Sequence, residues 1–356
     1  MTQALYLRPL GFLAGAVAEQ AVADGAAGPL AGGPLAYTAV EVIEGVPGRS
    51  RSTVRRYKDL SKTRESALRA LMDRVEDPRP PLHGTATDRP LVMGVVNVTP
   101  DSFSEHGLLE DPADAVAHGR MLIEQGADIL DIGGESTRPG ADPVPEEVEL
   151  DRVMPVVRGL ADGGVPISID TRKPAVMRAA VAAGAAIVND ITALEYDCRS
   201  PATVRELDVP VVLMHSKGDP KTMQVRPEYD DVVLEVYDAL ASRIEACVKA
   251  GIPRSAIIAD PGIGFGKTFR HNLEILERLS LLHGLGVPLV LGVSRKGFLG
   301  ALTGREGGPA RAAASIGAAL AGVAQGVQIV RTHDVRETRD AVTAWLAACD
   351  PRHATV

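Results

Sequence analysis

Cysteine is scarce in this chain, and the few that are present stand apart from one another. Cys198, Cys247 and Cys349 are the only three cysteines among 356 residues, and they form no Cys-x-x-Cys pair with a histidine-rich companion. This spacing argues against a disulfide framework and against a zinc site. A reducing compartment fits best, so we expect a cytoplasmic protein.

An excess of basic charge and long apolar runs are also missing. The formal net charge is -8 and the pI is near 5.6, whereas general nucleic-acid binders are usually basic. No run reaches the ~18 apolar residues of a membrane helix. The apolar stretch from Gly11 to Ala18 is followed by Glu19 and lacks the clustered cationic region of a signal peptide. We therefore expect small-molecule partners, with no nucleic acid and no membrane.

From about residue 90, strand-like and helix-like segments alternate. Strands are expected near 91–97, 128–132, 166–170, 186–190, 210–214, 256–260, 288–292 and 327–331. Helices are expected near 112–125, 145–162, 174–183, 200–207, 229–250, 271–283, 309–325 and 335–348. The strand cores are rich in Val, Ile and Leu, as in a parallel sheet that is covered on both faces. This alternation predicts an α/β fold, a (β/α)8 TIM barrel over residues 86–350.

Residues 1–85 have a different character and predict a small α+β domain in front of the barrel. Strands are expected at Leu5–Leu10 and Ala36–Ile43, and helices at Ala16–Asp24 and Thr53–Val75. Gly/Pro-rich spans at 25–34 and 45–50 separate these segments, and Pro78–Asp88 is interpreted as a linker. The region from Arg49 to Arg74 is locally basic. It could recruit a phosphorylated substrate or an acidic partner, or it could be a solvated helix face.

Polar residues follow several predicted strands, at the end where such a barrel carries its catalytic rim. Asn97, after the first strand, offers a hard oxygen ligand. Since Mg²⁺ takes few protein ligands and keeps phosphate oxygens, Asn97 could hold the metal while a diphosphate supplies other ligands; a turn cap is the structural alternative. Arg138, after the second strand, suits anionic oxygens because its planar fork donates two charge-assisted hydrogen bonds.

The third, fourth and sixth strands end in Asp170, Asn189 and Asp260. A buried carboxylate is costly without a partner, so these rim positions require a ligand with matching donors. A pterin has such donors in its ring N–H and exocyclic amine, and Lys296, after the seventh strand, could donate to its carbonyl. Each Asp taken alone could also be a helix cap or a salt-bridge partner.

The glycine-rich segment Gly262–Thr268 superficially suggests a phosphate-binding P-loop, but that motif needs a glycine where this chain has a proline. We interpret its glycines as letting the backbone pass close to a flat ring, with Phe265 or Lys267 lining it. At the last strand, Arg331 could stack on a planar heterocycle and His333 could hold diphosphate. An exposed strand end is the alternative for this last pair.

Together these motifs resemble those of dihydropteroate synthase, the folate-pathway transferase that sulfonamides inhibit. The resemblance covers about residues 90–348. It rests on five motifs in the family's order: Asn97–Phe103, Gly133–Gly140, Asp260–Lys267, Ser294–Lys296 and Arg331–Asp334.

The resemblance implies that the nitrogen of 4-aminobenzoate attacks the CH2 carbon of 6-hydroxymethyl-7,8-dihydropterin diphosphate and expels pyrophosphate. No protein nucleophile is needed. By the same resemblance, pterin contacts are expected from Asp170, Asn189, Asp260 and Lys296, with Met214, Phe265, Lys267 and Arg331 nearby. Diphosphate and Mg²⁺ contacts are expected from Asn97, Arg331 and His333, and aryl-amine contacts from Thr137, Arg138 and Ser294. The catalytic group would be Asp170, Lys296, Arg331 and His333, with Asp170 as the principal stabiliser of the developing cation, and we expect a homodimer.

Two departures from the family pattern leave alternatives open. The first loop reads Ser-Glu-His-Gly at Ser104–Gly107, where the family commonly has Ser-Asp-Gly-Gly, and residues 1–85 have no counterpart in the minimal enzyme. Either could accompany a modified aryl amine of a methanopterin-type pathway. A pterin-dependent methyltransferase should lack the Ser-Thr-Arg-Pro and Ser-Arg-Lys pieces, and a non-catalytic pterin-binding paralogue is the other alternative. We expect residues 1–85 to influence the amine or phosphate end of the site.

Overall fold

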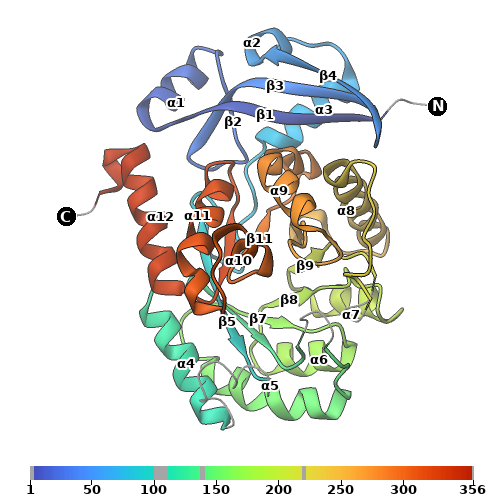
Figure 1. The fold of residues 1–356 in the computed structure, drawn as a ribbon, viewed down its shortest axis with the longest axis vertical. Helices are drawn as coiled ribbons and strands as arrows, with labels where there is room; N and C mark the ends of the chain where they lie inside the picture. The colour runs from blue at the N-terminus through green and yellow to red at the C-terminus, as the bar shows by residue number, and fades with distance from the viewer. Residues whose placement is uncertain (1–3, 100–110, 137–140, 219–221, 355–356) are drawn as a thin grey trace.

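The computed structural model describes residues 4–99, 111–136, 141–218 and 222–354, which form an N-terminal sheet packed on a barrel. In Figure 1 this sheet and its helices lie at one end of the molecule, at the top, and the barrel lies below them. The C-terminal helix of the barrel ends beside the first helix of the chain.

The N-terminal part contains β1 (Leu5–Ala14), α1 (Gly15–Ala23), β2 (Gly28–Pro29), β3 (Leu35–Val46), β4 (Arg49–Arg56), α2 (Tyr57–Leu60) and α3 (Ser66–Glu76). β3 pairs antiparallel with β1 on one side, and with β2 and β4 on the other. The small α+β domain expected before the barrel is therefore present.

The single helix predicted over Thr53–Val75 is wrong. Its first residues belong to β4, which pairs with β3 from Val46↔Arg49 to Ala39↔Arg56. The Pro-Gly step between β3 and β4 is the turn of a hairpin rather than a separator, and Ser, Thr and Val in β4 favour a strand once β3 is there to pair with. The helical part is divided between α2 and α3.

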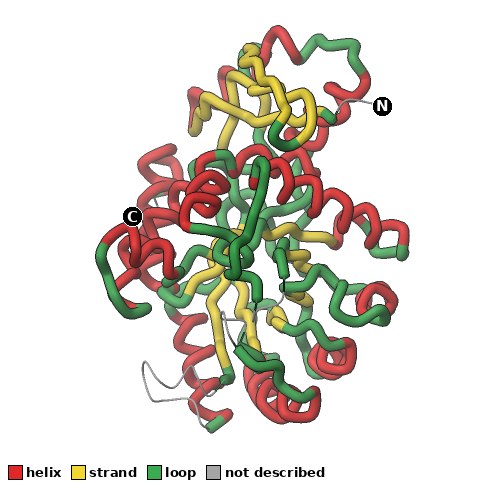
Figure 2. The backbone as a smooth tube through the Cα atoms, turned by 45° about the vertical axis from the view of Figure 1, so that its right-hand side comes forward, coloured by secondary structure: helices red, strands yellow, loops and turns green. Residues whose placement is uncertain are grey.

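The barrel strands are β5 (Leu91–Asn97), β6 (Ile129–Gly133), β7 (Ile167–Asp170), β8 (Ile187–Asp190), β9 (Val211–Met214), β10 (Ile257–Asp260), β11 (Val290–Gly292) and β12 (Ile329–Thr332). They pair in the order β10-β9-β8-β7-β6-β5-β12-β11, and the bridge Ala259↔Leu289 joins the two ends. Figure 2 shows the strands inside a ring of helices. The predicted TIM barrel is confirmed.

The helices around the barrel follow the predicted cycle with one addition. They are α4 (Pro112–Glu124), α5 (Glu146–Leu160), α6 (Pro174–Ala182), α7 (Ser200–Leu207), α8 (Val232–Lys249), α9 (Phe269–Glu277), α11 (Ala312–Val323) and α12 (Val335–Cys349). The addition is α10 (Gly297–Thr303), after β11; short 3-10 turns η2 (Arg254–Ala256), η3 (Leu279–Leu285), η4 (Pro309–Arg311) and η5 (Pro351–His353) complete the set. In the described part of the chain, every helix is too short or too polar to span a bilayer.

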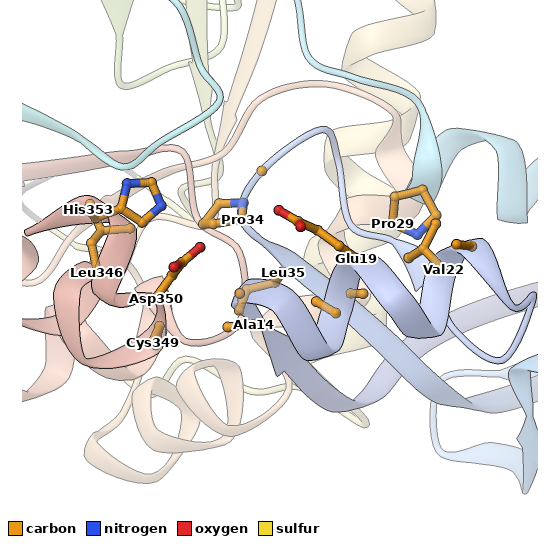
Figure 3. Close-up of a pocket in the computed structure, with 15 residues that line it drawn as sticks. Ala14, Glu19, Val22, Pro29, Pro34, Leu35, Leu346, Cys349, Asp350 and His353 are labelled. Carbon is orange, nitrogen blue, oxygen red and sulfur yellow. The ribbon is translucent and has the colours of Figure 1, made fainter.

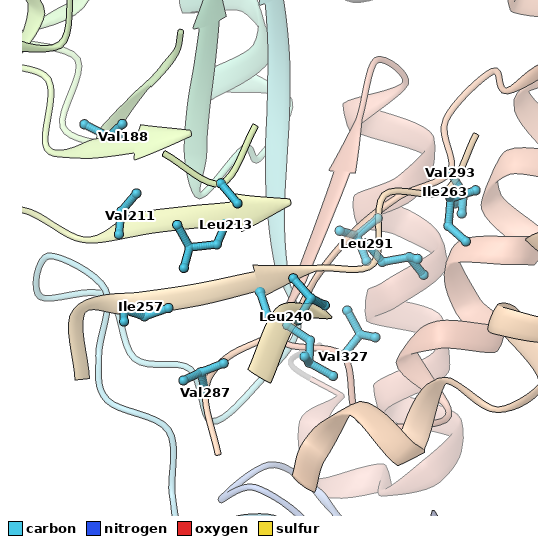
Figure 4. Packing of buried hydrophobic residues seen from close by; sticks show 14 of the residues in the cluster. Val188, Val211, Leu213, Leu240, Ile257, Ile263, Val287, Leu291, Val293 and Val327 are labelled. Carbon is cyan, nitrogen blue, oxygen red and sulfur yellow. The ribbon is translucent and has the colours of Figure 1, made fainter. Parts of the chain in front are cut away.

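Two apolar clusters hold the barrel. One packs strands against helices, with Val211, Leu213 and Leu291 among its members (Figure 4). The other combines residues from seven strands with Leu82, which is 0% exposed. Leu82 lies in the segment interpreted as a linker, so that segment contributes to the barrel core.

The N-terminal part contacts segments that precede barrel strands. Arg79 donates to the backbone oxygen of His283 at 3.1 Å, and Leu30 packs against Gly326; these partners come just before β11 and β12. Tyr6 sets its ring edge-on against Tyr237 of α8, with centroids 5.3 Å apart. These contacts belong to the end of the barrel opposite the catalytic rim, so they do not support the expected influence on the amine or phosphate end.

Candidate active site

An ion-pair network joins the ends of four strands. Arg331 of β12 donates from Nε to Asp131 Oδ2 at 2.6 Å and from Nη2 to Asp170 Oδ2 at 3.0 Å. Asn189 of β8 donates to the same oxygen of Asp131 at 3.1 Å. Since Asp131 is 0% exposed, its charge depends on these donors, and removal of any of them would leave a buried polar group short of a partner.

Asp260 and Lys296 stand beside this network. Asp260 Oδ1 accepts from the backbone N–H of Gly262 at 2.7 Å, and the Nζ of Lys296 lies 4.3 Å from the centre of the Phe265 ring. Burial raises the pKa of Asp260. Burial, followed by the charge of Arg331, lowers the pKa of Lys296 to about 8. The two groups are thus held close to the point where each can exchange a proton or a charge-assisted hydrogen bond with a ligand.

Asp170 and Arg331 have opposite electrostatic environments. Burial and then the neighbouring Asp131 raise the pKa of Asp170, against the lowering effect of Arg331. For Arg331, burial lowers the pKa, but Asp131 and Asp170 together outweigh it and raise the pKa. A cation therefore stands between carboxylates at the rim, which suits a polar heterocycle with donors on one edge and a carbonyl on another.

The glycines of the loop after β10 have a reason that differs from our interpretation. Gly262 and Gly266 have φ of 65° and 61°, and a Cβ at either would meet the backbone oxygen of His215 or Lys217 at 1.9 and 2.5 Å. These glycines therefore let the β10 loop lie directly against the β9 loop. What they accommodate in the structure is a neighbouring chain segment, not a flat ring.

Lys267 ties this loop together. Its Nζ donates to the backbone oxygens of Gly262 and Phe265 at 2.9 and 3.0 Å and lies 2.9 Å from Nδ1 of His215. Burial, followed by the charge of Lys267, lowers the pKa of His215 to about 3, so the imidazole is a neutral acceptor. The ammonium group is thus engaged inside the protein, and direct contact of Lys267 with a substrate stays a prediction. Met214, at the end of β9, is buried below the same loop.

A second group of predicted residues lies on the neighbouring strands β11, β12 and β5. His333 Nδ1 is 3.0 Å from Ser294 Oγ, and the same hydroxyl accepts from the His333 backbone N–H at 3.1 Å. Asn97 ends β5, which is paired with β12. The structure therefore brings Ser294 and His333 into contact on strands adjacent to that of Asn97. Thr137 and Arg138 lie outside the described residues, as does the first loop with Glu105 and His106.

Sequence reasoning missed Asp131 because it sits inside a strand rather than at its end. The available signal was a single carboxylate in the otherwise apolar segment Ile129–Gly133. It also missed a buried ion cluster after β6, in which Glu135 pairs with Arg172 and Lys173, and Lys173 also pairs with Glu149. This cluster anchors the start of the loop that leads to Thr137 and Arg138.

No group of three or more His, Cys, Asp or Glu side chains is placed to hold a metal ion in the ranges that the structure describes. Asn97 is half-buried and offers one neutral oxygen donor. That donor set fits a Mg²⁺ ion that brings most of its ligands with it, because Mg²⁺ commonly binds through one or two protein groups plus phosphate oxygens and water.

A groove of about 480 Å³ lies elsewhere, between α1, the start of β3 and the end of α12. Figure 3 shows Glu19 and Asp350 projecting along it, with Ala14, Leu35 and Leu346 among its apolar walls. It includes none of the predicted site residues, so the chemistry described above belongs to the barrel rim.

Comparisons with known proteins agree with the barrel and its motifs. The pterin binding enzyme family matches residues 93–333. Dihydropteroate synthase of Neisseria meningitidis serogroup C is 49% identical over 263 residues, covering 73% of this chain and 93% of the relative. That of Escherichia coli K12 is 46% identical over 262 residues, covering 73% and 92%.

Solved structures of the same enzyme match equally well. Xanthomonas albilineans dihydropteroate synthase with 4-aminobenzoic acid is 51% identical, covers 74% of this chain and 94% of its own, and has a TM-score of 0.70. The same enzyme in complex with 7,8-dihydropteroate is 47% identical, covers 76% and 98%, and has a TM-score of 0.69. The resemblance drawn from the motifs is confirmed, and the chain belongs to the dihydropteroate synthase family of pterin-binding enzymes.

Proposed function

We propose that this chain is a dihydropteroate synthase, a transferase that joins 6-hydroxymethyl-7,8-dihydropterin diphosphate to 4-aminobenzoate and releases pyrophosphate in folate biosynthesis. The observation that carries the proposal is the network of Asp131, Asp170, Asn189 and Arg331 at the rim. Asp260 and Lys296 complete a set of acceptors and donors beside it. The relatives at 46–49% identity that carry this name support the same conclusion.

The rim residues bind and orient the pterin. Asp260 is the acceptor for the paired N–H donors of the ring, because its two oxygens match that fork and its burial strengthens a charge-assisted bond. Asn189 adds an amide at the same edge. Lys296 donates to the pterin carbonyl, and the ring of Phe265 beside its Nζ limits the directions that this ammonium group can take.

In the reaction, the C–N bond forms between the amine nitrogen and the pterin CH2 carbon while the C–O bond to diphosphate breaks. Positive charge develops on the methylene and negative charge on the leaving group. Asp170 stabilises the former, and Arg331, held by Asp131 and Asp170, keeps that carboxylate oriented. Preorganised charges of this kind are a large source of catalysis because they do not have to reorganise during the step. The amine proton passes to solvent.

The diphosphate end is assigned to Asn97, Ser294 and His333. The contact between His333 and Ser294 fixes the imidazole, leaving its other nitrogen free to be directed at a phosphate oxygen. Mg²⁺ bound there would neutralise negative charge on the leaving group. A titration tests this placement: Mg²⁺ should bind weakly to the free protein and more tightly with pyrophosphate, whereas tight binding without diphosphate would contradict it.

The aryl amine is assigned to the loop that carries Thr137 and Arg138, with Ser294 facing it. We propose 4-aminobenzoate as the natural amine because a close relative was solved with that acid. A Yersinia pestis relative was solved with a sulfonamide drug, so a sulfonamide should compete with 4-aminobenzoate here. We further propose a cytoplasmic homodimer, and light scattering measures the assembly.

Pyrophosphate release tests the function directly. The purified full-length chain is given the pterin diphosphate with 4-aminobenzoate, with a ribosylated aminobenzene phosphate, or with no amine. Release that depends on 4-aminobenzoate, together with formation of dihydropteroate, supports the proposal. Faster turnover with the ribosylated amine would assign the chain to the methanopterin-type reaction, and absence of release with either amine would contradict enzymatic function.

A further inference from the structure

β4 is an edge strand that is open to solvent along its whole length. All eight of its residues, Arg49–Arg56, are exposed. One side pairs with β3 in continuous register, and the other side pairs with no strand within the described residues. An outer row of backbone N–H and C=O groups is therefore available for pairing with another chain.

This strand begins a segment of strongly basic charge. Residues 49–64 contain seven Lys and Arg and one Asp, a net charge of +6; since the whole chain carries -8, the rest carries -14. Arg56 pairs with Asp59 at 2.9 Å. The other six basic side chains join no ion pair within the described part of the chain: Arg49, Arg51, Arg55, Lys58, Lys62 and Arg64.

Three of these arginines lie on one face of the sheet. Arg49, Arg51 and Arg55 stand at alternate positions, and side chains two residues apart on a strand project to the same side, ~6.6 Å from one another. Arg51 has Glu44 opposite it in β3, but no ion pair joins the two. On the other face Val54 is 66% exposed. The strand thus offers a row of positive charge on one side and an apolar contact on the other.

Charge on an edge strand can serve simply to prevent aggregation. Other protective devices are missing from β4, however: it is eight residues long, contains no proline, and keeps its register with β3 without a bulge. The arginines would repel a second copy of β4, yet they leave the edge able to pair with a strand of opposite charge. A nucleic acid could use the charges but not the backbone groups.

We propose that β4 is a docking edge for an acidic, extended segment of a partner protein. The segment adds as a further strand of the sheet, with carboxylates opposite Arg49, Arg51 and Arg55. Backbone hydrogen bonds supply much of the affinity, and the alternating carboxylates supply the selectivity.

The test uses the full-length chain and a labelled synthetic peptide as long as β4, in which Glu alternates with Val. A matched peptide replaces each Val by Pro, which keeps the charge but cannot form a ladder. The variant is Arg49→Ser/Arg51→Ser/Arg55→Ser. Its control removes the same charge from exposed barrel positions, Arg158→Ser/Arg205→Ser/Arg336→Ser.

We expect the Glu-Val peptide to bind, to slow amide exchange in β4, and to lose about tenfold in affinity with the β4 variant because three exposed ion pairs are removed. The control variant should bind normally, and both variants should keep wild-type turnover. The proposal is overturned if the proline peptide binds as well, if the β4 variant binds as the wild type does, if a single-stranded oligonucleotide of equal charge binds more tightly, or if no peptide binds.

Discussion

Asp131→Asn is the substitution that most directly tests how the rim is organised. The new side chain has nearly the same shape but no charge, and its amide group places N–H donors where Arg331 and Asn189 already donate. Arg331 would keep Asp170, at 3.0 Å, as its remaining partner. The rim should therefore keep its overall shape while Arg331 and Asn189 lose their shared anchor.

The size of the effect follows from burial. Loss of one partner from a buried ion pair costs ~3–5 kcal/mol. The lower end applies here because Arg331 is 22% exposed and retains a second carboxylate. We expect about 3 kcal/mol lower stability and about tenfold weaker binding of a pterin analogue, which corresponds to ~1.4 kcal/mol. Removal of the Asp131 charge should also bring the pKa of Asp170 down.

Denaturant unfolding and calorimetry with a pterin analogue measure the two effects separately. Asp128→Asn is the matched control: Asp128 is also buried and paired with arginines, Arg89 and Arg339, but it lies just before β6, away from the rim. It should cost stability and leave pterin affinity unchanged. If Asp131→Asn lowered stability alone, as the control does, Asp131 would be a structural residue with no part in positioning Arg331 for the ligand.

Three other perturbations test the pocket, a buried histidine and the junction with the N-terminal part. Asp260→Asn should weaken binding of a pterin analogue by ~1.5–3 kcal/mol, because one charge-assisted contact is lost, and unchanged affinity in calorimetry would remove Asp260 from the pocket. Burial, and then the charge of Arg79, lower the pKa of His283 to about 3, so between about pH 3 and the unfolded value of ~6.5 the unfolded chain holds a proton that the folded chain does not. Stability should therefore fall on acidification, by ~2 kcal/mol through this group from about pH 7 to pH 5, and His283→Gln should lose that share in denaturant unfolding; equal losses in both proteins would contradict the assignment. Leu82→Ala should cost ~2–5 kcal/mol, and a chain that starts at residue 86 should melt at a lower temperature than the full chain, whereas equal melting temperatures would show that the barrel core closes without Leu82.

The barrel could be predicted from the sequence because each strand is a short Val/Ile/Leu-rich run followed by a helix and a glycine. Residues 187–190 and 211–214 show this pattern clearly, and the observed strands there begin within one residue of the expected positions. The polar residues that follow such strands were identifiable for the same reason. Asp170 and Asp260 break an apolar run at its end, where the chain turns toward the rim.

Contacts between distant segments could not be predicted in this way. Asp131 looks like an interruption of a strand until Arg331, 200 positions later, is placed beside it. Lys267 looks like a ligand contact in a glycine-rich loop, but its acceptors are carbonyls of that loop and His215 of another. For β4 the decisive fact is its pairing with β3, because the sequence of Arg49–Arg56 has no apolar alternation of its own.

The N-terminal part combines two surfaces with different physical roles. Tyr6, Leu30 and Leu82 bury apolar surface against the barrel, so this side contributes to stability. β4 faces solvent on both faces and carries charge opposite to that of the rest of the chain. Because the contacts of this part with the barrel lie before β11 and β12, at the end opposite the rim, a partner bound along β4 would leave the path to Asp170 and Lys296 open. Recruitment through β4 and turnover at the rim can therefore proceed at the same time, and a change in one surface need not alter the other.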